Sequence, residues 1–213
     1  MEKSYLKELI KRYPVLKSCE ESVLKAYGVL ENCFMNGNKL LIAGNGGSSA
    51  DGQHIVGELM KGFNSARPCK KEFADKLKAV DTDKGALLSL RLQGALPSIS
   101  LDGQHGLTTA YINDVKDGGL FYYAQGVYGY GKEGDVFLGI STSGNSENVI
   151  NAAITAKALN MKVIALTGET GGKLKDFADV LINVPSKETF IIQELHIPVY
   201  HCICSMLEER FFN

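Results

Sequence analysis

The sequence lacks a long apolar run, and no stretch approaches the roughly 20 residues that a membrane-spanning helix needs. Its opening segment, MEKSYLKELIKRYPVLKSC, carries charges throughout and has no apolar core of the kind found in signal peptides. These absences predict a cytoplasmic protein with no membrane partner.

An excess of either charge is also missing, because 23 basic and 24 acidic residues give a formal net charge of −1. Without a basic field to hold nucleic acid, no polynucleotide partner is expected. Cysteines are few and odd in number, and none sits in a CxxC pair: Cys19, Cys33, Cys69, Cys202 and Cys204. They are typical of buried thiols in a reducing compartment rather than of a disulfide scaffold.

What the chain does contain is enough apolar material, 45% of 213 residues, for one substantial core. Between residues 3 and 35 apolar side chains recur at helical spacing, interrupted near Pro14, and predict two helices. Their apolar stripe must be covered by the same domain or by another copy of the chain. We expect a helical oligomerisation segment at 1–35 and one main domain at 36–213.

Buried strands alternate with helices in the main domain. Apolar runs at 39–44, 135–140 and 161–168 each precede a turn and a helix-compatible stretch, and a further strand is expected at 180–185. This alternation predicts a parallel sheet covered on both faces. Residues 61–110 are harder to interpret: we expect a helix near 70–80, a strand near 97–101, and otherwise loop and short helix. Residues 188–212 predict a long helix, disturbed at Pro198.

A turn rich in glycine and serine follows the strand expected at 39–44. It comprises Gly44, Asn45, Gly46, Gly47, Ser48 and Ser49. Free backbone N–H groups and the helix dipole favour an anion at such a turn, and phosphate is the obvious ligand, although an ordinary tight turn has the same composition. No Walker-type run of glycine, lysine and serine or threonine exists, and a dinucleotide fingerprint requires a third glycine where Ser49 stands. Nucleotide binding is therefore disfavoured.

A second turn, GISTSGNSEN, has four hydroxyl side chains around Gly144: Ser141, Thr142, Ser143 and Ser146. One of them is expected to cap the following helix, but four hydroxyls exceed what a cap needs. The others can surround a phosphate with neutral donors. Both turns follow parallel strands, at the sheet edge where α/β folds bind ligands.

Two pairs of side chains could carry chemistry. His54 and Glu58 are four residues apart on one helix face, so they can share a metal or a substrate, or simply form a surface pair. Gln193 and His201 lie about 12 Å apart along the last helix. Either that helix breaks near Pro198, or the two side chains reach a common site from different subunits. Taken alone, His201 also fits a buried core histidine.

The segments AGNGGSSADGQHIVGEL, GDVFLGISTSGNSENVI, VIALTGETGGKL and IQELHIPVYH resemble phosphoheptose isomerases of the sugar isomerase (SIS) superfamily, in this order and along most of the chain. The resemblance implies an SIS-type, flavodoxin-like α/β fold, a three-layer α/β/α sandwich with a central parallel sheet. It also implies a homotetramer with the N-terminal helices packed in its middle. The implied reaction is isomerisation of D-sedoheptulose 7-phosphate to D-glycero-D-manno-heptose 7-phosphate, toward ADP-heptose and lipopolysaccharide precursors.

Carried over residue by residue, the resemblance implies Glu58 as catalytic base and His201 as acid. The family's metal, usually zinc, is implied at His54, Glu58, Gln193 and His201. The implied substrate contacts are Asn45, Gly46, Gly47, Glu58, Asn113, Asp114, Ser141, Thr142, Ser143, Ser146 and Gln193. Moving a proton between C1 and C2 through an enediol requires such a base and acid. Two imidazoles and a carboxylate suit Zn²⁺, whereas glutamine is an unusual zinc ligand.

Two alternatives remain open. A non-catalytic branch of SIS proteins acts through protein contacts or senses sugar phosphates, but it lacks the glutamate and the histidine. An isomerase for another phosphosugar is the second alternative, because a pocket of neutral hydroxyls does not report sugar length. This chain also carries extra residues at about 64–95, ahead of Asn113 and Asp114, which could change a lid or the choice of sugar.

Overall fold

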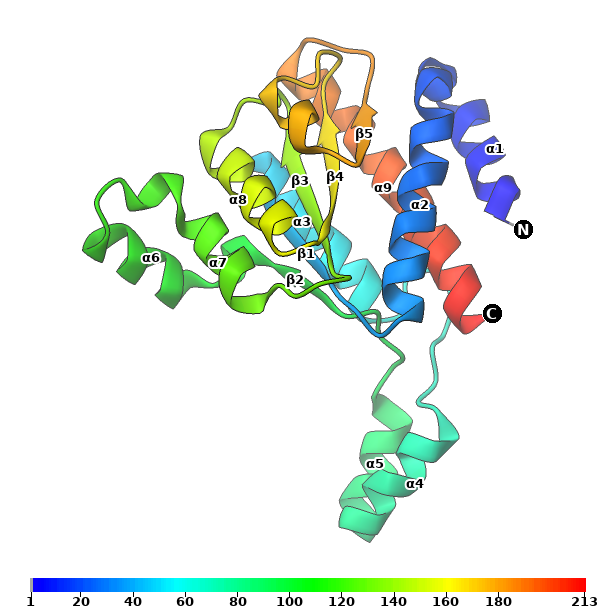
Figure 1. Ribbon diagram of the computed structural model, residues 1–213. Coiled ribbons are helices and arrows are strands. Elements are labelled where there is room, and N and C mark those ends of the chain that lie inside the picture. The colour runs from blue at the N-terminus through cyan, green and yellow to red at the C-terminus, as the bar shows by residue number, and fades with distance from the viewer. Residues whose placement is uncertain (1) are drawn as a thin grey trace.

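The computed structural model describes residues 2–213, with side chains from Ser4 onward. One five-stranded parallel sheet forms the centre, in the order β2-β1-β3-β4-β5 (Figure 1). Its strands are β1 (Leu40–Gly44), β2 (Ser98–Ser100), β3 (Val136–Ser141), β4 (Lys162–Thr167) and β5 (Val180–Asn183). Each strand predicted from the sequence is confirmed to within two residues at its ends.

Helices cover both faces of this sheet. The helices of the described residues are α1 (Glu2–Arg12), α2 (Glu20–Met35), α3 (Gly47–Met60), α4 (Lys71–Val80), α5 (Thr82–Arg91), α6 (His105–Asp114), α7 (Tyr122–Tyr130), α8 (Glu147–Ala158) and α9 (Thr189–Phe212), of which α4 and α5 lie away from the sheet. Short 3₁₀ turns lie at η1 (Pro14–Cys19), η2 (Leu101–Gly103), η3 (Gly118–Leu120) and η4 (Lys173–Phe177).

The alternation of side chains along each strand divides the interior into two cores. Leu40 and Ile42 of β1 point into a core shared with α1, α2, α3 and α9. Leu41 and Ala43 point into the opposite core, shared with α7 and α8. The strand order matches the flavodoxin-like arrangement, so the expected three-layer α/β/α sandwich is confirmed.

The apolar stripe of the N-terminal helices is covered within the chain. Leu6 and Leu9 of α1 and Val23 and Leu30 of α2 are buried in the same core as the sheet. The 1–35 segment is therefore a structural part of the described domain, and its stripe does not by itself require a second copy. Its role in oligomerisation stays a prediction.

Helix α9 continues through Pro198 without a break. It is long and apolar enough to cross a membrane by length and composition, contrary to the expectation that no stretch approaches this limit. Because 61% of the relevant window is buried inside the protein, as in an ordinary core helix, this is weak evidence for a span.

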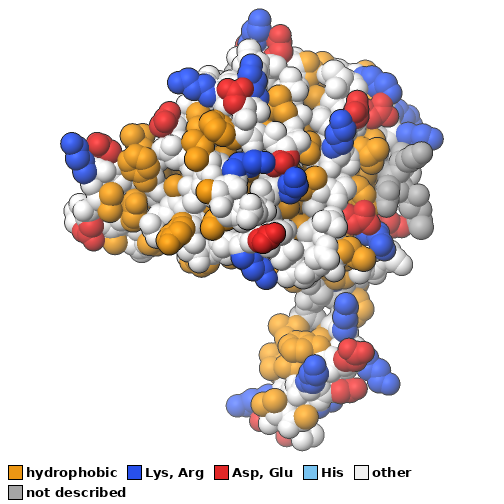
Figure 2. Space-filling view, viewed as in Figure 1, with side chains coloured by type: hydrophobic (Ala, Val, Ile, Leu, Met, Phe, Trp, Pro, Cys, Tyr) orange, Lys and Arg blue, Asp and Glu red, His pale blue; other side chains and the backbone are white. Residues whose placement is uncertain are grey.

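The segment at 64–95 forms a hairpin of α4 and α5 that projects away from the rest of the molecule (Figure 1). Of the described residues 68–95, only Gly85 is buried. Large apolar side chains on this hairpin face outward: Phe73, Val80, Leu87, Leu88, Leu90 and Leu92. Figure 2 shows apolar side chains gathered on this projection. The helix near 70–80 is confirmed, and α6 and α7 are more regular than the expected loop.

Candidate active site

The two anion-compatible turns flank the point where the strand order reverses, between β1 and β3. At this position an α/β sheet opens a crevice at the carboxyl ends of its strands. The side-chain amides of Asn45, in the first turn, and Asn148, at the start of α8, donate to one another at 2.9 Å. Gly46, with a φ of 56°, permits the turn into α3. The two turns therefore form one surface.

No hydroxyl of the serine turn at 141–146 caps helix α8. Ser146 occupies the N-cap position of α8, but its side chain makes no cap bond. Instead its Oγ lies 3.0 Å from Ser141 Oγ, and Ser143 Oγ accepts the N–H of Asn145 at 3.1 Å. Gly144 has a φ of 67°, and a Cβ there would collide with the backbone of Gly171. The expected cap is absent from this described turn, so its hydroxyls can turn toward a ligand.

Helices α3 and α9 bring two histidines to one carboxylate. Glu58 Oε1 lies 3.2 Å from His54 Nε2 and 3.0 Å from His201 Nε2. The Glu58 side chain is only 5% exposed, whereas His54 and His201 reach solvent. His54 and Glu58 are therefore not a surface pair, and His201 is not an isolated core histidine.

The electrostatics of this cluster suit proton transfer. Burial raises the pKa of Glu58 to about 7, against smaller opposing effects of Cys204 and Lys61. Burial and the nearby His54 lower the pKa of His201. A carboxyl group that titrates near neutrality can both take up and release a proton.

The same cluster fits a metal ion. The three ligand atoms of His54, Glu58 and His201 lie within 4.8 Å of one another. Both Glu58 oxygens and His201 Nε2 are buried, and none makes a hydrogen bond of regular geometry among the described residues. Buried polar atoms without partners are costly, and a cation would satisfy all three at once. Two imidazoles and a carboxylate are a common catalytic zinc set.

Gln193 lies on α9, about two turns before His201. A Cβ on Gly47 would collide with Gln193 Nε2, so the amide lies against the first turn. Since α3 and α9 run side by side in the same direction, Gln193 meets the start of α3 while His201 meets Glu58 near its end. The predicted role of Gln193 as a metal ligand stays a prediction, and its predicted role beside the substrate turn is compatible with this contact.

The expectation that Gln193 and His201 reach a common site from different subunits stays a prediction, but Glu58 and His201 need no second subunit to meet. It rested on the 12 Å rise between Gln193 and His201, which seemed too large for one shared site. Glu58 and His201 meet inside a single chain.

Asn113 and Asp114 are not brought to the crevice. They end α6, are exposed, and hydrogen-bond to each other at 2.9 Å. Figure 1 shows α6 beyond α7, apart from α9. Their predicted substrate contacts stay a prediction.

Sequence reasoning missed a polar group behind His54. Tyr200 Oη lies 2.9 Å from His54 Nδ1 and 3.3 Å from Asp51 Oδ1. Asp51, His54 and Glu58 are spaced at i, i+3 and i+7, which places them on one face of α3. That spacing was the available signal for Asp51; nothing local pointed to Tyr200.

A buried ion pair that the sequence reasoning also missed holds the end of α3. Arg67 donates to the carbonyls of Glu58 and Leu59 at 2.8 and 2.7 Å, and to Glu208 Oε1 at 2.8 Å. Glu208 also accepts backbone N–H groups of residues 63–65. The pair fixes the backbone of Glu58 and the chain that leads from it to the α4–α5 hairpin.

A cleft of about 310 Å³ opens onto His201. Its walls come from α9 and from α1, including Tyr5, Glu8 and Arg12. The N-terminal helix thus lines one approach to the cluster.

Comparison with known proteins agrees with this geometry. A family model described as SIS domain matches residues 95–168. A phosphoheptose isomerase of Aneurinibacillus thermoaerophilus is 40% identical, with 93% of this chain and 84% of the relative covered. Another, from Sulfurimonas denitrificans, is 36% identical over 99% and 97% of the two chains. The solved phosphoheptose isomerase of Neisseria gonorrhoeae is similar with a TM-score of 0.74 and 33% identity, covering 97% and 96%.

The fold and the matched model define an SIS-domain protein. With identities of this size over nearly its whole length, the chain belongs to the phosphoheptose isomerase family, whose members are aldose–ketose isomerases. The family resemblance seen in the sequence motifs is confirmed.

Proposed function

We propose that this protein converts D-sedoheptulose 7-phosphate to D-glycero-D-manno-heptose 7-phosphate. The observation that carries the proposal is the contact of the buried Glu58 carboxylate with the imidazoles of His54 and His201. The same helix, α3, begins at the glycine and serine turn, which can bind an anion. Phosphoheptose isomerases of similar sequence support the choice of sugar.

The substrate lies along α3. Its phosphate binds between the first turn and Ser141, Thr142, Ser143 and Ser146, through neutral hydroxyl and backbone donors. Gly47 and His54 are about 10 Å apart along the helix axis, a span that an extended phosphosugar covers. The far end of the sugar, with C1 and C2, then lies level with His54, beside the Glu58 carboxylate.

Glu58 and His201 divide the proton transfers. Glu58, whose Oε1 lies against both imidazoles, removes a proton from C1. The electrons of the C1–H bond form the C1–C2 double bond while the C2 carbonyl oxygen gains a proton from His201. In the second half the O1 proton returns to His201, the C1 carbonyl forms, and Glu58 delivers its proton to C2. The same carboxylate serves both halves.

One Zn²⁺ per subunit is proposed at His54, Glu58 and His201, a set of three protein ligands that leaves a position open as catalytic zinc sites do. Bound there, the ion would polarise the sugar carbonyl and stabilise the charge of the enediolate. With Nε2 of His201 directed at the ion, Nδ1 is the nitrogen left to exchange protons with the sugar oxygens.

We also propose that the protein assembles as a homotetramer and lies in the cytosol. Support for assembly comes from the α4–α5 hairpin, because two ten-residue helices that bury almost nothing are marginal alone. An apolar groove at its base includes Phe34, Leu92, Phe211 and Phe212. Hairpin and groove occur on every copy, so one symmetric contact can cover both. The five free cysteines fit a reducing compartment.

Sedimentation tests the assembly. Val80→Asp and Leu90→Asp place charge on exposed hairpin positions and should reduce the wild-type mass to that of a smaller species, whereas Lys78→Asp should not. A wild-type monomer, or an unchanged mass in both variants, would contradict a hairpin-mediated tetramer.

Incubation with D-sedoheptulose 7-phosphate tests the function directly. The mannoheptose 7-phosphate product should form with wild-type protein and not with Glu58→Gln. Unphosphorylated sedoheptulose should react poorly, because the phosphate contacts are lost. Turnover of a shorter phosphosugar with none of the heptose would replace the proposed substrate, and binding without turnover of any phosphosugar would favour a sensing role.

A further inference from the structure

His54 is connected to two side chains that lie behind the metal-binding cluster. Tyr200 Oη is 2.9 Å from His54 Nδ1 and 3.3 Å from Asp51 Oδ1. Tyr200 is 3% exposed and Asp51 is 9% exposed, so the contact between them is buried, whereas the contact of Tyr200 with His54 is partly buried. Asp51, Tyr200 and His54 thus form a hydrogen-bonded chain that ends at the nitrogen of His54 facing away from Glu58.

The protons that Asp51, Tyr200 and His54 carry decide which group donates and which accepts in each of these two hydrogen bonds. An aspartate carboxylate only accepts, so the Tyr200 hydroxyl donates to Asp51 Oδ1. Tyr200 Oη is then an acceptor, and His54 Nδ1–H is its donor. A neutral imidazole has one ring proton, which leaves Nε2 with a bare lone pair. That atom is the one 3.2 Å from Glu58 Oε1.

We propose that Tyr200, oriented by Asp51, is a positioning residue that keeps the His54 proton on Nδ1 and so makes Nε2 the metal-binding atom. The inference rests on the metal set given under Proposed function. Outer partners of this kind orient a ligand ring and raise its basicity.

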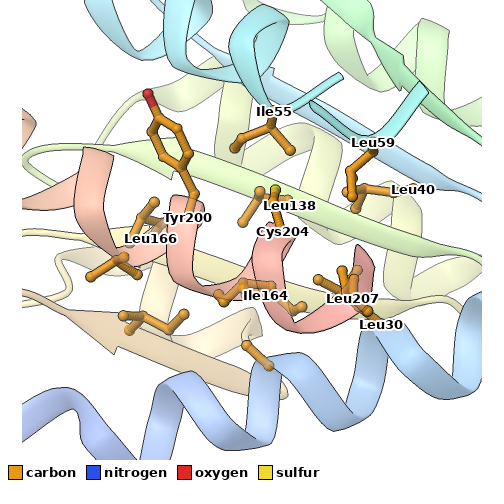
Figure 3. A pocket seen from close by; sticks show the side chains of 14 residues that line it. Leu30, Leu40, Ile55, Leu59, Leu138, Ile164, Leu166, Tyr200, Cys204 and Leu207 are labelled. Atoms are coloured by element: carbon orange, nitrogen blue, oxygen red, sulfur yellow. The ribbon is translucent and has the colours of Figure 1, made fainter. Parts of the chain in front are cut away.

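The surroundings of Tyr200 suit such a role. Its ring lines a small apolar cavity of about 20 Å³ beneath α3, together with Ile55, Leu138 and Cys204 (Figure 3). Figure 3 shows the hydroxyl turned away from these apolar side chains. The Tyr200 ring also meets the His54 ring edge-on, with centroids 5.4 Å apart. Packing therefore holds the ring, and the hydroxyl has few directions in which to bond.

Nitrogen NMR of the metal-free protein measures the tautomer directly. With ¹⁵N-labelled histidine, and His54→Gln to assign the signals, wild-type His54 should carry its proton on Nδ1. Tyr200→Phe should abolish this preference. Asp51→Leu leaves the tyrosine hydroxyl no acceptor except Nδ1, so the ring proton should move to Nε2. A wild-type ring protonated on Nε2, or one whose tautomer is the same in both variants, would overturn the inference.

Zinc affinity, measured by competition with a chelator, gives the second readout. Tyr200→Phe should bind Zn²⁺ about 10- to 100-fold more weakly than the wild type, and added zinc should restore its turnover. Tyr123→Phe is a matched control, because it removes another buried hydroxyl, bonded to the Gly44 carbonyl away from the cluster. It should bind zinc as the wild type does.

Equal zinc affinity in wild type and Tyr200→Phe would refute the positioning role. An equal loss in Tyr123→Phe would also refute it, by assigning the effect to general destabilisation. If the wild type binds no zinc, the metal proposal fails by itself, and the tautomer of the metal-free ring still decides whether Tyr200 orients His54.

Discussion

Glu58 and His201 meet inside one chain, with 3.0 Å between Glu58 Oε1 and His201 Nε2. The two residues lie 143 positions apart, and adjacent helices α3 and α9 bring them together. In a mixed oligomer, each site would therefore take Glu58 and His201 from the same chain.

Mixing Glu58→Gln chains with His201→Asn chains should not restore activity. Each site in a hybrid would still contain one defective residue, because both come from the same chain. Subunit exchange should be verified with differently tagged chains. Recovery of activity in verified hybrids would place the two residues in different subunits and contradict the structure.

Ser143→Ala should weaken phosphosugar binding by about 1–3 kcal/mol, the usual loss for one hydrogen bond to a charged group. The Ser143 side chain is at the surface of the serine turn, so the substitution should leave the fold intact. Calorimetric titration with phosphorylated and free sugar separates the effects. Equal losses for the two sugars would show that this turn does not hold the phosphate.

Glu208→Gln should lower the free energy of unfolding by about 3–5 kcal/mol, because it leaves the buried charge of Arg67 uncompensated. Burial acts to raise the pKa of Glu208, yet its backbone hydrogen bonds and Arg67 hold that pKa below its ordinary value. Urea unfolding measures the loss. Glu209→Gln, at a half-buried neighbouring position, is the control, and similar small effects in both would contradict a structural ion pair.

His196 should make the protein less stable in mild acid. Burial lowers the pKa of His196 to about 4, and its Nδ1 has no hydrogen-bond partner in the described part of the chain. Between the unfolded value near 6.5 and this folded value, the unfolded chain binds the extra proton. The contribution is therefore complete above about pH 6.5 and falls as pH drops toward 4, by at most about 1.4 kcal/mol per pH unit.

His196→Leu removes this titration while the Thr167 carbonyl keeps its bond from Val184. Urea unfolding at pH 7 and pH 5 should show a smaller loss in the variant than in the wild type. An identical loss would mean that His196 is not responsible.

The sheet could be predicted because buried parallel strands read as short apolar runs bounded by turns, as at 39–44 and 135–140. The anion turns were also predictable, since glycine and hydroxyl side chains at strand ends have a local chemical meaning. Without the resemblance, the pairing of Glu58 with His201 could not be predicted, because it depends on how α3 and α9 pack across the sheet.

Other details also depend on packing. Tyr200 looks like an ordinary core aromatic in the sequence, and only its contact with His54 reveals a polar role. Ser146 looks like a helix cap, but its hydroxyl pairs with Ser141 instead. The α4–α5 hairpin has an apolar stripe that suggests burial, yet the single chain leaves it exposed.

Hydrogen exchange during turnover in deuterated water tests the central claim, that Glu58 is the base that moves the proton between C1 and C2. Wild-type protein should place solvent deuterium at C2 of the mannoheptose product. Glu58→Gln should bind the phosphosugar but show about two to four decades less turnover and exchange. Turnover and exchange at the wild-type rate in a folded Glu58→Gln protein would remove Glu58 from the reaction.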